Sequence, residues 1–208
     1  MTLHGCEVVL RALWLGCYGA AMAIGFSGAV RARRRSVAHG AGLAGRIGAL
    51  PAYLVTAVPY YAACTALWRP IPWDADTSVP GLVAAAVLGA AGLVLYVGAH
   101  RALGDNYDVS GGLGTVVHDG GQLVTSGPYA RVRHPMYLGI ALGALSGLLL
   151  FRTWTFVWVL ASLIAIARKA RIEDRLLAEQ FGPEFTRYQA AVPAWRPRFL
   201  LRHSAAVH

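Results

Sequence analysis

Long, uninterrupted blocks of apolar residues restrict the fold of this chain more than any other feature of its sequence. A helix needs about 20 apolar residues to cross a hydrocarbon layer of about 30 Å, and these blocks have that length. A soluble domain would instead distribute its apolar positions at the period of a helix or a strand. Because 56% of the 208 residues are hydrophobic and only 14% are charged, we predict an all-α, polytopic membrane protein.

Five blocks are expected to form transmembrane helices. They cover 8–30, 47–68, 80–100, 136–151 and 154–167. In the first block the basic residues follow the apolar ones, which favours a retained helix over a cleavable signal peptide. Only Arg152 and Thr153 separate the last two blocks, which predicts a tight helical hairpin.

The chain is interpreted as one integral membrane domain over 1–208. Its parts are 1–101 with three helices, 102–134 with a loop, 135–167 with the hairpin, and 168–208 with a C-terminal helix and tail.

Basic residues between the blocks predict how the chain is oriented in the cell membrane. The segments 31–46, 100–133 and 168–208 hold five, three and eight Lys or Arg residues, whereas the opposite side holds only Arg69 and Arg152. The N-terminus is therefore expected outside and the C-terminus in the cytoplasm. The net charge of +9 would favour anionic lipid headgroups. It is accompanied by no nucleic-acid recognition motif, so no nucleic-acid partner is expected, and the sequence leaves the oligomeric state open.

The three cysteines lie in or beside apolar blocks. Cys6, Cys17 and Cys64 lack the spacing of metal ligands, so we interpret them as small packing residues and predict no metal site.

The loop 102–134 is longer than a simple connection requires. Unstructured loops of this length in compact proteins are usually functional or disordered. Its many glycines allow sharp bends or a close approach to a ligand, and apolar residues such as Val116 and Leu123 would anchor it. This combination favours an ordered, functional loop over a flexible tether.

The segment GPYARVRHPMYLG, at 127–139, gathers charges where the fourth helix is expected to begin. Pro135 suits the first turn of a helix, which places the helix start near His134. The partial positive charge and free N–H groups of a helix start favour anions. Arg131 and Arg133 add full charges, so a carboxylate or a phosphate could bind here.

Two tyrosines accompany these charges. Tyr129 precedes the arginines and Tyr137 lies in the first helical turn, so their rings could flank a planar ligand. Arg and Tyr also occur at membrane surfaces without forming a site. The whole combination beside a glycine-rich loop favours a binding site over such an interfacial belt.

The C-terminal segment begins as a continuation of the fifth block and supplies acidic residues. Apolar residues four positions apart predict an amphipathic helix. Lys169 lies one turn before Glu173, and the two could simply form an ion pair. Alternatively, Glu173 faces the loop and accepts hydrogen bonds from a ligand's hydroxyl or ammonium groups.

The sequence LVTSGPYARVRHPMYLG, followed after a two-helix hairpin by IEDRLLAEQFGPEFTRYQAAVPAW, resembles the integral membrane methyltransferases. These include the isoprenylcysteine carboxyl methyltransferases and the phospholipid N-methyltransferases. The resemblance covers about 102–199. It implies S-adenosylmethionine as methyl donor, held by the loop and the tail at the cytoplasmic membrane face. It also implies a lipophilic acceptor from the bilayer, with a carboxylate, thiol or amine as the reacting group.

The resemblance and the charge pattern together indicate which residues bind the cofactor. They are His118, Gly121, Gln122, Leu123, Val124, Tyr129, Arg133, His134, Pro135, Met136, Tyr137 and Glu173. No catalytic residue is assigned with certainty, and Lys169 and Asn106 are candidates on the acceptor side. The sequence departs from the family in having Asp174 where a second Glu is commoner. It also has no clear counterpart of the family's acceptor-side arginine, for which Arg168 or Lys169 is the nearest residue.

Methyl transfer from a sulfonium is an in-line displacement, for which proximity and alignment can lower much of the barrier. A carboxylate or thiolate acceptor needs no base. An ammonium acceptor must first lose a proton, for which His134 is a candidate, although donor binding is its preferred role.

The alternative function is that of an NADPH-dependent membrane reductase of the sterol reductase type, which has a similar HPxY pattern. Asp105, Asp108 and Asp119 in the loop disfavour the additional phosphate of that cofactor. A non-enzymatic carrier is disfavoured because ionisable residues are nearly absent from the apolar blocks.

Overall fold

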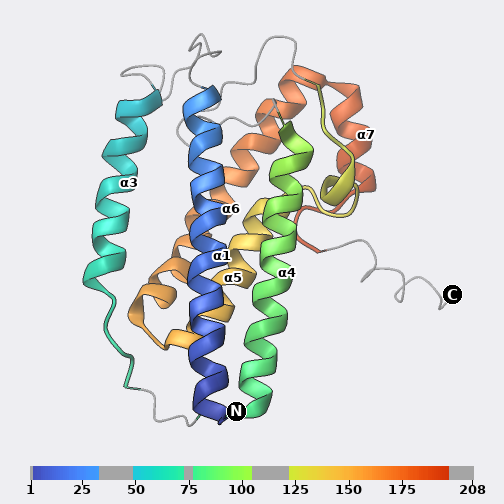
Figure 1. Ribbon diagram of the computed structural model, residues 1–208. Helices are drawn as coiled ribbons and strands as arrows, with labels where there is room; N and C mark the ends of the chain where they lie inside the picture. The colour runs from blue at the N-terminus through green and yellow to red at the C-terminus, as the bar shows by residue number, and fades with distance from the viewer. Residues whose placement is uncertain (1, 33–48, 73–76, 105–121, 197–208) are drawn as a thin grey trace, which may run out of the picture.

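The computed structural model describes residues 2–32, 49–72, 77–104 and 122–196, and in this part of the chain the regular structure is helical. The elements are α1 (Leu3–Ala32), α3 (Ala49–Ala66), α4 (Val79–Leu103), the short 3-10 helix η3 (Gly127–Ala130), α5 (Pro135–Phe151), α6 (Trp154–Phe181) and α7 (Pro183–Ala191). The all-α prediction is confirmed (Figure 1).

Two stretches among the described residues are long and apolar enough to cross a membrane, by length and composition. They are Leu3–Ile24 in α1 and Val79–Leu103 in α4, and the apolar helix Pro135–Phe151 is shorter. Large apolar side chains point outward from both long helices, including Leu13 at 57% and Val94 at 71% exposure. The five-span arrangement and its orientation stay predictions.

The helices α4 and α5 pack with their backbones in close approach. A Cβ atom added at Gly139 would lie 2.8 Å from the carbonyl oxygen of Gly92, and one added at Gly92 would lie 2.9 Å from the backbone nitrogen of Gly143. Small residues allow membrane helices to approach in this way. The Ser146 hydroxyl donates to the Ala85 carbonyl across the same contact at 2.7 Å.

Helix α1 packs on α4 and α5 through aromatic side chains. The ring of Trp14 stacks on Tyr18 of the same helix at 4.4 Å and meets Phe151 of α5 edge to face at 5.5 Å. The Tyr18 hydroxyl donates to the carbonyl of Gly89 at 2.9 Å. These contacts fix α1 against the pair formed by α4 and α5.

A polar network joins α1, the residues before α4 and the turn between α5 and α6. Glu7 is 5% exposed and accepts hydrogen bonds from Arg11 at 2.6 Å and Thr77 at 2.7 Å. The turn itself consists of Arg152 and Thr153, the two-residue connection that the sequence indicates. Arg152 has a φ of 49° and donates from Nη2 to Thr77 at 3.3 Å.

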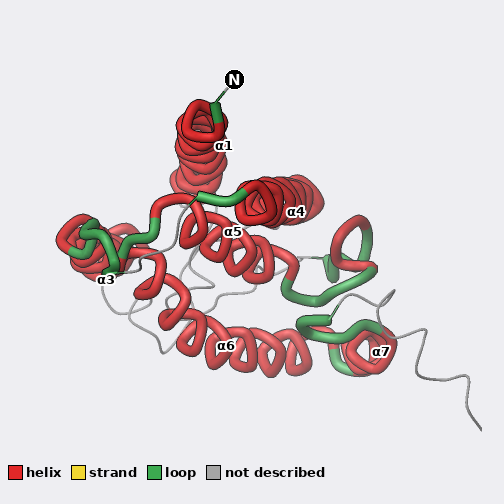
Figure 2. Tube along the Cα trace, turned by 90° about the horizontal axis from the view of Figure 1, so that it is seen from below, coloured by secondary structure: helices red, strands yellow, loops and turns green. Residues whose placement is uncertain are grey.

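Helix α6 continues without a break from its apolar half into the polar C-terminal segment. It ends at Phe181, the following Gly182 has a φ of 51° that suits glycine, and α7 then turns back along the end of α6. In Figure 2, α5 and α6 run across a view in which α1 and α4 are seen nearly end-on. The inclined course of α6 brings its polar half beside the beginning of α5.

Candidate functional site

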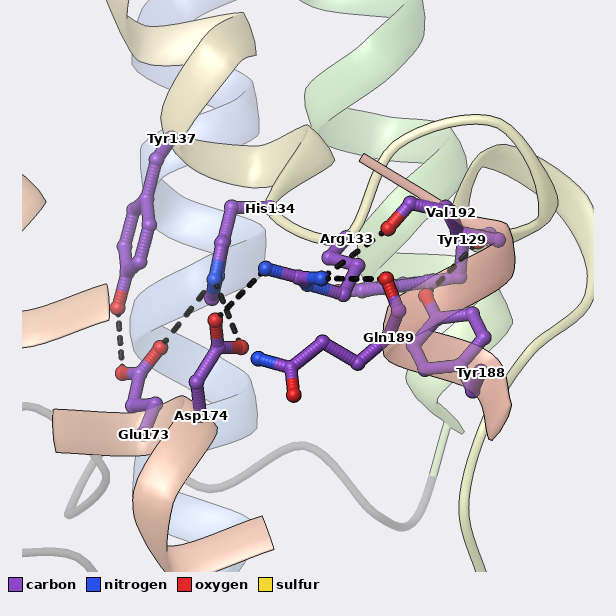
Figure 3. Close-up of polar contacts among 9 residues, drawn as sticks. All are labelled: Tyr129, Arg133, His134, Tyr137, Glu173, Asp174, Tyr188, Gln189 and Val192. Carbon is purple, nitrogen blue, oxygen red and sulfur yellow. Dashed lines mark hydrogen bonds and ion pairs between the residues drawn. The ribbon is translucent and has the colours of Figure 1, made fainter. Parts of the chain in front are cut away.

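Three segments distant in the sequence meet at the beginning of α5 (Figure 3). They are the first turn of α5, the polar half of α6 and the residues that follow α7. We call this group the acid–aromatic cluster, and its side chains are Arg133, His134, Tyr137, Lys169, Glu173, Asp174 and Trp195.

Asp174 holds two consecutive residues at the start of α5. Its Oδ2 accepts a hydrogen bond from Nη2 of Arg133 at 2.9 Å, and its Oδ1 lies 3.2 Å from Nε2 of His134. Burial alone would raise the pKa of Asp174, but the hydrogen bond and charge of His134, together with the charge of Arg133, hold this pKa below its ordinary value. The carboxylate therefore stays ionised at neutral pH.

Glu173 faces the same helix start one residue earlier. Its Oε1 accepts a hydrogen bond from the Tyr137 hydroxyl at 2.5 Å and lies 3.6 Å from Nζ of Lys169. Its Oε2 lies 3.8 Å from Nδ1 of His134, which is longer than a hydrogen bond. The ion pair between Lys169 and Glu173 that the spacing predicts is present. Glu173 also accepts a hydrogen bond from Tyr137 in α5, so its carboxylate connects two helices.

Aromatic rings cover one side of these acids. The ring of His134 stacks on Tyr137 with centroids 5.7 Å apart, and Trp195 lies 5.4 Å from His134 and 6.4 Å from Tyr137. The Lys169 ammonium lies 5.1 Å from the centroid of Tyr137. His134 is 7% exposed whereas Trp195 is 38% exposed, so Trp195 forms the solvent-facing side of this stack.

The segment after α7 pairs with the residues before α5 through backbone hydrogen bonds. The N–H of Arg133 donates to the carbonyl of Pro193 at 2.9 Å, and the N–H of His134 donates to that of Ala194 at 3.2 Å. Nη1 of Arg133 donates to the carbonyls of Gln189 at 3.0 Å and Val192 at 3.1 Å. Arg133 thus holds the C-terminal segment against the start of α5. The binding of an anion by Arg133 and by the exposed Arg131 stays a prediction.

A side-chain hydrogen bond also holds helix α7 against η3. The hydroxyl of Tyr188 donates to the carbonyl of Tyr129 at 2.8 Å. Burial raises the pKa of Tyr188 to about 12, so the hydroxyl keeps its proton and remains a donor. Tyr129 therefore lies against α7, while Tyr137 lies against Glu173.

The other predicted cofactor residues lie at three places. Pro135 is buried in the first turn of α5 with Met136 beside it, and Gln122, Leu123 and Val124 belong to the segment that leads to η3. His118, Gly121 and Asn106 lie outside the described residues. Within the part of the chain that the structure describes, no group of three or more His, Cys, Asp or Glu side chains is placed to hold a metal ion.

Two features of the cluster were not assigned from the sequence. Trp195 follows the last helix, and no periodic pattern in the sequence predicts its position. It is, however, the last residue of the motif on which the family resemblance rests. The contacts of Asp174 with Arg133 and His134 join positions about forty residues apart, which no local spacing reveals.

The fold and the cluster define a class: a helical protein with membrane-length apolar helices and an acid–aromatic cluster built at the start of one of its helices. The family model of the phospholipid methyltransferases matches residues 81–184, which is half of the chain. The chain belongs to this family, and the resemblance to membrane methyltransferases is confirmed. The matched region takes in α4, η3, α5 and α6.

Two relatives are similar over a shorter part of the chain. The cobalt-zinc-cadmium resistance protein CzcN of Cupriavidus metallidurans is 43% identical over 81 residues, which are 38% of this chain and 37% of the relative. The nickel-cobalt-cadmium resistance protein NccN of Alcaligenes xylosoxydans xylosoxydans is 36% identical over 89 residues, 42% of this chain and 41% of the relative. The chain thus spans about two fifths of the length of these relatives.

Proposed function

We propose that this protein transfers a methyl group from S-adenosylmethionine to a lipophilic acceptor at the cytoplasmic face of the cell membrane. Membership of the phospholipid methyltransferase family supports the reaction class. The main structural support is the hydrogen bond between Glu173 and Tyr137, whose ring stacks on that of His134 beside Trp195.

The cluster has the chemistry that such a donor requires. S-adenosylmethionine carries an ammonium group, a sulfonium and a planar base. Oε1 of Glu173 is occupied by the Tyr137 hydroxyl, whereas Oε2 keeps capacity for a further donor because its contact with His134 is 3.8 Å long. The exposed ring of Trp195 offers a flat apolar surface for a base.

When bound, S-adenosylmethionine supplies an electrophilic methyl carbon, whose bond to sulfur breaks with its electron pair going to sulfur as an acceptor lone pair forms the new bond. The chain's own contribution is to align the two reactants and to keep water away. Glu173 would accept a hydrogen bond from the donor's ammonium. The stack of His134, Tyr137 and Trp195 would fix the orientation of the base.

If the acceptor is an amine, His134 would take its proton in this proposal, in addition to its preferred role in donor binding. Asp174 is ionised and only accepts hydrogen bonds, so Nε2 of His134 must carry the hydrogen of their contact. In a neutral imidazole Nδ1 is then the accepting nitrogen, and it points toward Glu173. A carboxylate or thiolate acceptor would not need this step.

The orientation in the membrane belongs to the same proposal. Five spans with the N-terminus outside would put the C-terminal segment, and with it the acid–aromatic cluster, on the cytoplasmic side. The acceptor would enter from the bilayer, and its reacting group would be a carboxylate, a thiol or an amine.

Calorimetry on the full-length protein in detergent tests this function by comparing S-adenosylmethionine with NADPH. We expect S-adenosylmethionine to bind and NADPH not to bind. A hydrogen bond to a charged acceptor contributes roughly 1.5–3 kcal/mol. Glu173→Gln should therefore weaken binding about tenfold to a hundredfold, at about 1.4 kcal/mol per tenfold.

Glu179→Gln is the matched control, because Glu179 lies in the same helix, carries the same charge and is exposed. It should bind as the unmodified protein does. Binding of NADPH alone would overturn the proposal in favour of a reductase, and equal effects of the two substitutions would remove Glu173 from the site.

A further inference from the structure

One face of α6 is exposed along most of the helix and changes from apolar to basic partway along. Its residues recur at spacings of three and four, which places them on one side of an α-helix. We call this the outer face of α6, and it consists of the exposed residues Trp158, Ala161, Ile164, Arg168, Arg171 and Arg175.

The outer face points away from the acid–aromatic cluster. Ala170, at 2% exposure, lies on the opposite side of the helix together with Glu173. Among the residues that the structure describes, the ion pairs of α6 involve Lys169, Glu173 and Asp174 and none of the three arginines. Three positive charges on one face of the helix therefore have no anionic partner among the described residues.

The apolar part of the face indicates what surrounds the basic part. Ile164 is 65% exposed, which suits a side chain directed at lipid, and Trp158 is 42% exposed although its ring lies 6.5 Å from that of Tyr60 in α3. Arg168 follows Ile164 by one turn on the same face, and Ile172, 53% exposed, lies beside Arg171. A helix whose lipid-facing side turns basic meets the headgroup layer at that point.

Helix α6 is inclined to α1 and α4, because it runs across the view of Figure 2, in which those two helices are seen nearly end-on. The basic part lies on the half of α6 that follows its apolar half. Long arginine side chains can place the guanidinium in a polar layer while their methylene groups remain in contact with apolar surface.

We propose that Arg168, Arg171 and Arg175 form a binding surface for the phosphate groups of anionic phospholipids. A guanidinium donates two parallel hydrogen bonds to a phosphate, and the negative potential of an anionic leaflet attracts such residues. The basic part ends at Glu179, the next exposed residue on this face. The surface does not depend on the proposed methyl transfer, because it lies on the side of α6 that faces away from Glu173.

Lipid titration of the full-length protein tests this surface. The protein, purified in a neutral detergent, is titrated with phosphatidylglycerol and with phosphatidylcholine, and the bound lipid is counted by native mass spectrometry. We expect tighter binding of phosphatidylglycerol. Replacing all three arginines by Gln should weaken that binding by roughly tenfold to a hundredfold, since each basic residue near an anionic surface contributes a severalfold factor.

The control removes the same charge elsewhere. Arg101, Arg187 and Arg196 are exposed and lie outside α6, so their joint replacement by Gln lowers the net charge equally. This variant should keep its affinity for phosphatidylglycerol. Replacing the three outer-face arginines by Lys should preserve most of the binding, and size-exclusion profiles check that each variant is folded.

Three results would overturn the proposal. Equal losses in both Gln variants would assign the binding to net charge, and unchanged binding in the outer-face variant would exclude this surface. Displacement of phosphatidylglycerol by inorganic phosphate at equal concentration would indicate a site for the free ion. None of these results bears on S-adenosylmethionine binding, so the two proposals fail separately.

Discussion

The carboxylate of Asp174 in α6 lies 3.2 Å from Nε2 of His134, the residue that precedes α5, although forty positions separate the two in sequence. The other oxygen of the same carboxylate accepts from Arg133. One acidic side chain thus positions two consecutive residues. Because Arg133 also holds the segment after α7, Asp174 links the C-terminal segment to the start of α5.

Asp174→Asn should destabilise the protein. The substitution keeps the shape of the side chain but removes the charge that Arg133 and His134 contact. Hydrogen bonds to charged groups contribute roughly 1.5–3 kcal/mol, so we expect a loss of this order in the free energy of unfolding. Thermal unfolding in detergent measures it, with Glu179→Gln as a control of equal charge change. Equal stability of the two variants would contradict this role of Asp174.

The contribution of Asp174 to the stability of the folded protein should also depend on pH. Its pKa in the folded protein lies below the ordinary value of 3.8, so its stabilisation is complete above that value and is lost as the pH falls through the lower, folded pKa. The difference in Tm between the unmodified protein and Asp174→Asn should therefore be constant near neutral pH and shrink below about pH 4. A difference that persists unchanged into strong acid would show that the charge of Asp174 is not its cause.

Trp195→Ala should weaken S-adenosylmethionine binding without unfolding the helices. The ring lies beside His134 and Tyr137 but is 38% exposed, so its removal leaves no large internal cavity. An aromatic pair contributes about 0.5–1.5 kcal/mol, which corresponds to a loss of about twofold to tenfold in affinity. Calorimetry measures the affinity. Trp195→Phe should restore most of it, and Trp158→Ala, on the outer face of α6, should have no effect.

The sequence predicts the helices because a membrane span imposes its own length and composition on the chain. The blocks at 136–151 and 154–167 correspond to α5 and to the apolar half of α6, since each is apolar throughout and Arg152 and Thr153 interrupt them. The ion pair of Lys169 with Glu173 also follows from spacing, because residues four apart lie on the same face of a helix.

Contacts between distant segments leave no comparable pattern in the sequence. The pairing of Arg133 and His134 with Pro193 and Ala194 uses backbone groups, whose positions depend on where α7 ends. The position of Trp195 depends in turn on that pairing. These contacts could be found only once the course of α6 was known.

The orientation of the chain is open to a direct test. If the asymmetry of basic residues decides it, a reporter fused after His208 should be active in the cytoplasm, and one fused before Met1 should be active outside. A fusion within the turn at Arg152 should again report the outside. An external signal from the C-terminal fusion would contradict this topology and place the acid–aromatic cluster on the other face.

Gly139→Ala should destabilise the contact between α4 and α5. The added methyl group would lie 2.8 Å from the carbonyl oxygen of Gly92 and 3.0 Å from the backbone nitrogen of Tyr96, so the helices must separate to admit it. Such overpacking typically costs about 1–3 kcal/mol, which unfolding in detergent would detect as a lower Tm. Because Gly139 lies one turn after Pro135, the same shift should move the start of α5 against α6 and weaken cofactor binding. Gly16→Ala provides the control, since a Cβ there has nothing within 4 Å and alanine is favoured over glycine in a helix. If the two substitutions changed stability alike, the close approach of α4 and α5 would not be what holds α5 in place.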